Sequence, residues 1–218
     1  MGAGAQPTLR IPLILLAVVN LAILGSRLWP WQDVLNLPGN GTTGIDPVVC
    51  LVAYTVLIFF VGGNRHEPIQ KALSAGAMLG LLAGCILVAQ VVLKTQFVGA
   101  VSFHPRLLRV GFLALAGVIW GFAGLRGAKS AGSAGIGMLA GLWSAMVSGL
   151  MASTAVLVQL YFAAAPVPET TDPWKQYEGL AIGNPATQSL VNSLNSATWF
   201  LLVGPLAEIG RASCRERV

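Results

Sequence analysis

The sequence is poor in charged residues. Only 10% of its 218 residues are Asp, Glu, Lys or Arg, against about 25% in an average soluble domain, and 55% are hydrophobic. So few charges indicate that much of the surface does not face water. The net charge of +5 comes from basic residues that stand singly between apolar runs, without the basic patches that bind nucleic acid. We therefore expect no nucleic-acid partner.

Signatures of catalysis and metal binding are also missing. The three cysteines form no CxxC pair and no Cys/His cluster, which argues against a disulfide framework and a zinc site. The glycines form no Walker pattern, so nucleotide binding is unsupported. His66, beside Glu67, and His104 stand alone next to prolines, which is typical of solvated or capping histidines. We expect no enzyme activity, catalytic residue, metal or cofactor.

Long apolar runs are the dominant feature of the chain. A helix needs about 20 apolar residues to cross the ~30 Å hydrocarbon core of a bilayer. The runs predict an all-α, multi-pass transmembrane bundle of about six spans, with approximate bounds 11–28, 47–61, 69–93, 107–125, 135–165 and 186–207. We expect residues 1–207 to form one transmembrane helical domain in a lipid bilayer, with the bacterial inner membrane as its location.

Local signals support these bounds. Asp46 and Pro47 suit the N-cap and first turn of the second span. Trp29 and Trp31 follow the first span and are typical of anchors at the membrane–water interface. Asp172 and Pro173 resemble another helix start, and we expect a short interfacial helix there.

The interiors of the six spans hold no side chain that is charged at neutral pH. Between their ends there is no Asp, Glu, Lys, Arg or His. Proton-coupled pumps place ionisable groups at membrane depth, and metal enzymes or proteases need carboxylate, His or Cys sets. This absence argues against these classes.

Small residues recur at four-residue spacing and share helix faces. Such stripes let two helix backbones approach closely, which favours association in lipid. The sequence predicts close packing within the chain, with a homodimer seam or a surface that slides during transport as alternatives. The candidate packing residues are Gly76, Gly80, Gly84, Gly117, Gly121, Gly137, Gly141, Ala145 and Gly149.

The start of the last span is rich in amides and hydroxyls. Asn192, Asn195 and Ser196 are spaced i, i+3 and i+4, so they share one helix face. Buried amides in lipid need partners, and hydrogen bonds between helices are one interpretation of this face. The alternative is a polar lining for a small-molecule or ion path, which Gln90 of the third span would complete.

Residues 208–218 break the pattern, with five charges in eleven residues. They are identical to the translation of a common short-read sequencing adapter preceded by one guanine. We interpret them as adapter rather than as a cytoplasmic tail. We therefore expect the genuine sequence to end near Ala207 and the natural C-terminus to be missing.

The orientation of the chain is not fixed by its basic residues. Each side of the predicted membrane would hold five Lys or Arg, so the positive-inside rule does not decide. The two longest and most acidic loops share one side, as external loops often do. We expect the N-terminus on the inner side.

Two functions remain open. A transporter-like or permease-like membrane component would explain the helix number, the glycine-rich helices and the polar face of the last span. A non-catalytic scaffold or assembly subunit, packing through Gly-rich faces, would explain the seams and the missing ionisable sites. We expect the partners to be the lipid bilayer and either further copies of the chain or other membrane subunits.

Overall fold

The computed structural model describes residues 10–28, 45–62, 67–96, 105–162 and 193–205, and no strand occurs among them. The helices are α1 (Arg10–Leu28), α3 (Ile45–Gly62), α4 (Glu67–Gln96), α5 (Pro105–Ala131) and α6 (Ala134–Phe162), followed by a helix over residues 193–205. The expected all-α class is thereby confirmed. The predicted interfacial helix near Asp172 and the tail 208–218 lie outside the described residues.

Three helices are long and apolar enough to cross a membrane: α4 over Glu67–Leu93, α5 over Leu108–Ala131 and α6 over Ala134–Gln159. The apolar parts of α1 and α3, Ile11–Ser26 and Asp46–Val61, are shorter. The structure is therefore consistent with a membrane protein, while six full spans are not confirmed.

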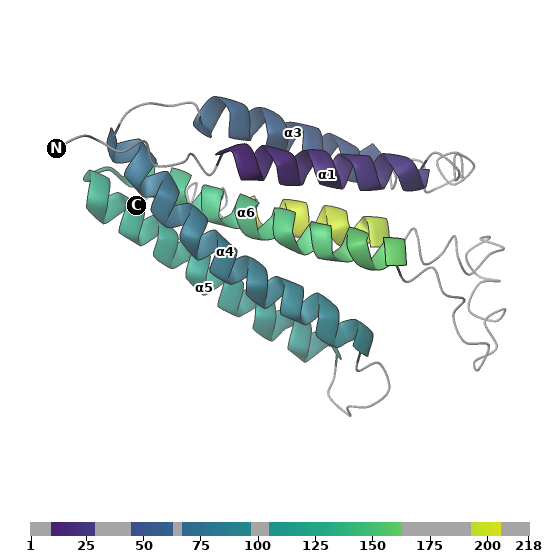
Figure 1. Ribbon diagram of the computed structural model, residues 1–218. Coiled ribbons are helices and arrows are strands. Elements are labelled where there is room, and N and C mark those ends of the chain that lie inside the picture. Colours follow the sequence, from purple (N-terminus) through teal and green to yellow (C-terminus); the bar gives the residue numbers. More distant parts are fainter. Residues whose placement is uncertain (1–9, 29–44, 63–66, 97–104, 163–192, 206–218) are drawn as a thin grey trace, which may run out of the picture.

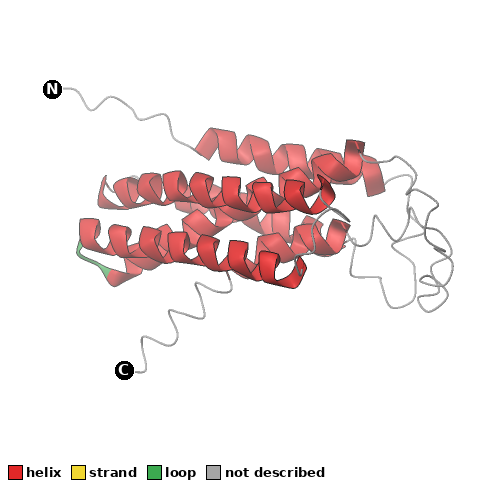
Figure 2. Cartoon of the chain, turned by 90° about the horizontal axis from the view of Figure 1, so that it is seen from below, coloured by secondary structure: helices red, strands yellow, loops and turns green. Residues whose placement is uncertain are grey.

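α5 and α6 form a tight helical hairpin. α5 extends past the expected end near residue 125, because Lys and Arg are good helix formers and cations suit a helix C-terminus. Gly132 ends the helix with a φ of 63°, a conformation that glycine adopts at no steric cost. The Ser133 carbonyl then accepts the first hydrogen bond of α6, from the Gly137 amide at 3.1 Å. This turn, green in Figure 2, marks what we name the turn end of the bundle.

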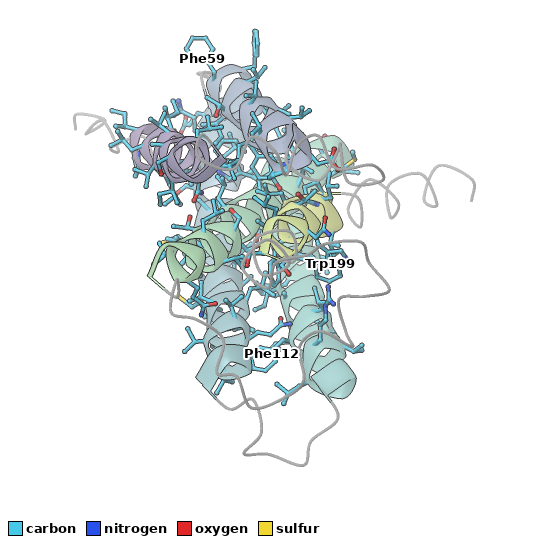
Figure 3. All side chains as sticks on the ribbon, turned by 90° about the vertical axis from the view of Figure 1, so that its right-hand side faces the viewer. Phe59, Phe112 and Trp199 are labelled. Atoms are coloured by element: carbon cyan, nitrogen blue, oxygen red, sulfur yellow. The ribbon has the colours of Figure 1, made fainter. Side chains whose placement is uncertain are left out.

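The helices lie in three layers, and consecutive helices run in opposite directions (Figure 1). α6 and the 193–205 helix form the middle layer, with α1 and α3 on one side and α4 and α5 on the other (Figure 3). α6 contacts α1, α4 and α5. All residues from Ala140 to Leu150 are buried except half-buried Leu142. α6 is therefore the central helix.

The outer surface is apolar. Phe60 of α3 is 74% exposed, Met78 of α4 66% and Val118 of α5 68%. Large apolar side chains exposed on three helices would be an aggregation liability in water. In a bilayer they face lipid tails, which agrees with the spans above.

α4 and α6 approach each other closely along a row of glycines on α4. A Cβ added to Gly76 would lie 2.5 Å from the carbonyl oxygen of Ala140, and one on Gly80 would lie 2.7 Å from that of Ser144. One on Gly84 would meet the side chain of Met151. The α4 stripe found in the sequence thus lies against α6 of the same chain.

α5 meets α6 through a second set of small residues. A Cβ on Gly137 would lie 2.6 Å from the Gly124 carbonyl oxygen, and one on Gly127 would lie 2.6 Å from the Cβ of Ala140. Gly124 and Gly127 were not among the packing residues expected from the sequence. Of the residues that were expected, Gly117 and Gly121 are half-buried, and Gly141 and Ala145 are buried.

Replacing Gly80 by Leu should disrupt the α4–α6 contact. The side chain would overlap the α6 backbone, so we expect the free energy of unfolding to fall by about 1–3 kcal/mol, measured by circular dichroism in mixed micelles with increasing dodecyl sulfate. Gly111→Leu on α5 is the matched control, because a Cβ there has no atom within 4 Å. Equal destabilisation by both changes would contradict the close approach at Gly80.

Candidate functional site

A tyrosine on α3 replaces a backbone hydrogen bond that is lost at a proline. In an α-helix the carbonyl of residue 201 accepts from the amide of residue 205, but Pro205 has no N–H. The buried Tyr54 hydroxyl donates to the Leu201 carbonyl oxygen instead. An unpaired carbonyl in hydrocarbon would cost several kcal/mol. Tyr54 therefore allows a proline in this helix and joins the outer α1–α3 layer to the middle layer.

Gly149 provides the space for this contact. A Cβ at Gly149 would lie 2.8 Å from the Phe200 carbonyl oxygen and 3.3 Å from the Tyr54 hydroxyl. A glycine at the centre of α6 therefore lets α3 and the 193–205 helix meet there. Gly149 was expected to pack helices, and it lies where three of them converge.

A second polar contact joins α1 to α6. The Asn20 side chain is fully buried and its Nδ2 donates to the Thr154 Oγ1 at 2.9 Å. The Thr154 hydroxyl in turn donates to the Leu150 carbonyl oxygen at 2.6 Å. Asn20 Oδ1 is buried and has no hydrogen-bond partner in the described part of the chain.

A third contact joins α5 to α6. The indole Nε1 of Trp120 donates to the Ser148 Oγ at 2.9 Å, and that hydroxyl donates to the Ala145 carbonyl oxygen at 2.9 Å. Both side chains are buried. Trp120 also packs against Gly204, where a Cβ would lie 3.3 Å from the indole ring. One tryptophan therefore contacts both helices of the middle layer.

The polar residues expected to line a path take different positions. Asn195 is exposed and Ser196 is half-buried, because the 193–205 helix turns Leu194, Ala197 and Leu201 inward. Asn192 lies outside the described residues.

Two further buried acceptors have no hydrogen-bond partner among the described residues. Gln90 on α4 is half-buried, and its Oε1 is one of them. The other is the Oγ of fully buried Ser144 on α6.

Groups suited to metal binding are not gathered in the described ranges. No three His, Cys, Asp or Glu side chains lie together there. Cys50 is half-buried, Cys85 is exposed on α4, and both thiols are free. His66 and His104 lie outside the described residues.

Two of the residues that make these contacts, Tyr54 and Trp120, were not expected from the sequence. A signal for the first was present, because Pro205 near the end of an apolar run requires a substitute donor. Nothing in the sequence identified which helix would provide it.

A scan against protein-family models and searches of curated proteins and of solved structures gave no match to this chain.

The Tyr54 contact predicts that the effects of Tyr54→Phe and Pro205→Ala on the free energy of unfolding are not additive. Tyr54→Phe should lower the free energy of unfolding by about 1–2 kcal/mol, because it leaves the Leu201 carbonyl unpaired. Pro205→Ala restores a backbone donor to that carbonyl, so Tyr54→Phe in this background should cost clearly less. A double-mutant cycle of unfolding in mixed micelles measures the difference. Additive effects would show that Pro205 and Tyr54 are not linked.

Proposed function

We propose that this chain is an integral membrane subunit that assembles with other membrane helices and does not itself catalyse a reaction. The observation that carries the proposal is the use of its buried polar side chains. Tyr54, Asn20 and Trp120 each donate to a group on another helix. Such hydrogen bonds hold helices together in lipid, so the donor groups of these side chains are used within the bundle.

The proposal counts α1, α3 and the 193–205 helix as further spans, giving six. Their alternation in direction with α4, α5 and α6 supports this count (Figure 1). The turn end carries exposed Lys71, Arg126 and Lys129. Because the sequence assigns five Lys or Arg to each side, these cations do not decide the orientation; the two long acidic loops on the opposite side favour an inner turn end and an inner N-terminus.

The outer face of α1 offers a place for a partner helix. Ala22, Gly25 and Ser26 are exposed there, and a Cβ at Gly25 would have no atom within 4 Å. We name these three residues the α1 patch. Small residues on a lipid-facing surface let another helix approach closely, so either a second copy or a different membrane subunit fits.

Ala22→Leu should weaken this association without unfolding the chain, because the added side chain points away from the bundle. We expect a smaller complex by native mass spectrometry in a mild detergent. Ala114→Leu, on the exposed face of α5, is the matched control and should leave the complex unchanged. An unaltered complex with Ala22→Leu would remove the α1 patch from the proposal.

A transport component is the second candidate, and one observation favours it. Asn20 Oδ1, Gln90 Oε1 and Ser144 Oγ are buried acceptors without a hydrogen-bond partner among the described residues. Such groups are costly in a dry interior, and water or a polar solute moving between the helices would satisfy them.

Thiol accessibility separates the two functions. In a chain whose native cysteines are replaced by Ser, we expect Ser144→Cys to resist a membrane-impermeant maleimide, because a packed seam excludes water. Ser130→Cys, at the exposed end of α5, should react in inside-out membrane vesicles, where the turn end faces the reagent, and serves as the matched control. Rapid labelling of Cys at position 144 in intact membranes would favour the transport component and overturn the assembly role.

A further inference from the structure

An arginine and a tryptophan are paired on the surface, at the end of the bundle opposite the turn end. The Arg109 guanidinium of α5 lies over the Trp199 ring, 4.1 Å from its centroid. Trp199 is half-buried and packs edge-on against Phe200, with the centroids 5.6 Å apart. Figure 3 shows Trp199 on the side of the 193–205 helix that faces α5. The ring thus fixes the position of a cation that is itself exposed.

The pair lies at the membrane boundary. Arg109 stands in the second turn of α5, which begins at Pro105, so it lies near the end of this membrane-capable helix. A charge here can reach the headgroup region, whereas one at the bilayer centre would be costly. Tryptophan also prefers this depth. Arg109 is therefore placed beside lipid headgroups and not among lipid tails.

The charge of Arg109 is not balanced by the part of the chain that the structure describes. The ion pair found there joins Lys71 and Glu67 near the turn end, at 2.7 Å. The first turn of α5 has no acidic residue, although the positive end of a helix dipole favours a negative group. An anion beside Arg109 would balance both the guanidinium charge and the positive end of the helix dipole.

An amide lies on the same helix face. Asn195 is exposed and precedes Trp199 by one helical turn, so the two side chains project from one side of the helix. An amide on a lipid-facing helix is costly unless it finds a hydrogen-bond partner. Its NH₂ group can donate to a phosphate oxygen.

We propose that Arg109, Trp199 and Asn195 bind the phosphate of an anionic phospholipid in the leaflet opposite the turn end. Stacking on Trp199 occupies one face of the planar guanidinium and leaves its edge N–H groups free to form paired hydrogen bonds with phosphate oxygens. An anionic lipid is favoured over a zwitterionic one, because the latter brings a second cation to a site that is already positive. The proposal is independent of the assembly role.

Lipid binding to the full chain tests this site. Protein delipidated in a maltoside detergent is titrated with phosphatidylglycerol or phosphatidylcholine, and bound lipid is counted by native mass spectrometry. We expect one phosphatidylglycerol to bind more tightly than phosphatidylcholine. Arg109→Gln should weaken that binding about fivefold, the contribution of one basic residue near a membrane surface.

Matched variants distinguish a specific lipid-binding site from general attraction between charges. Arg126→Gln removes an exposed cation from the same helix near the turn end and should leave the tight phosphatidylglycerol in place. Trp199→Leu should weaken binding, and Trp199→Phe, which keeps an aromatic face, should restore most of it. Each variant is first shown to melt like the wild type in phosphatidylcholine.

Three results would overturn the proposal. Equal losses with Arg109→Gln and Arg126→Gln would indicate nonspecific attraction. Equal affinity for both lipids would remove the preference for an anionic headgroup. Displacement of the lipid by millimolar inorganic phosphate would assign the site to a free anion.

Discussion

The close approach of α4 to α6 is the contact on which the rest of the bundle depends. Lipid tails are as apolar as the helix side chains, so helices in a membrane associate through packing and hydrogen bonds. At Gly76 and Gly80 no side chain separates the two helices, and the α4 backbone faces the carbonyls of Ala140 and Ser144. This contact fixes which face of α6 is left for the other helices. α5 uses the neighbouring face through Gly137, and the remaining side accepts α1 and the 193–205 helix.

The need of buried polar groups for hydrogen-bond partners is the second constraint. The resulting hydrogen bonds join the layers that packing has brought together. Each of the three buried donors, on α1, α3 and α5, reaches a group in the middle layer. The Tyr54 contact couples this constraint to the first, because a Cβ at Gly149 would overlap the Phe200 carbonyl oxygen and crowd the Tyr54 hydroxyl. A proline, a tyrosine and a glycine from three helices thus act as one unit.

The interior and the surface of the bundle have different roles. The interior consists of two apolar clusters on opposite sides of α6, together with a few polar contacts. The proposed interactions with other molecules then fall to the surface, at the α1 patch for a partner helix and at Arg109 for a lipid headgroup. Three buried acceptors without described partners are the feature that a transport role would use. Whether water reaches Ser144 therefore distinguishes most directly between the assembly role and the transport role.

The sequence by itself determined the helical class, the position of the helices and the presence of glycine stripes, because apolar runs and four-residue spacing are local properties of the chain. It did not determine which helix each stripe faces, since the same spacing suits any neighbour. Tyr54 and Leu201 are 147 residues apart, and only the tertiary structure brings them together. The polar face of the last helix was visible in the sequence, but the tertiary structure directed Asn195 outward, because burying Leu194, Ala197 and Leu201 packs better against the apolar clusters around α6.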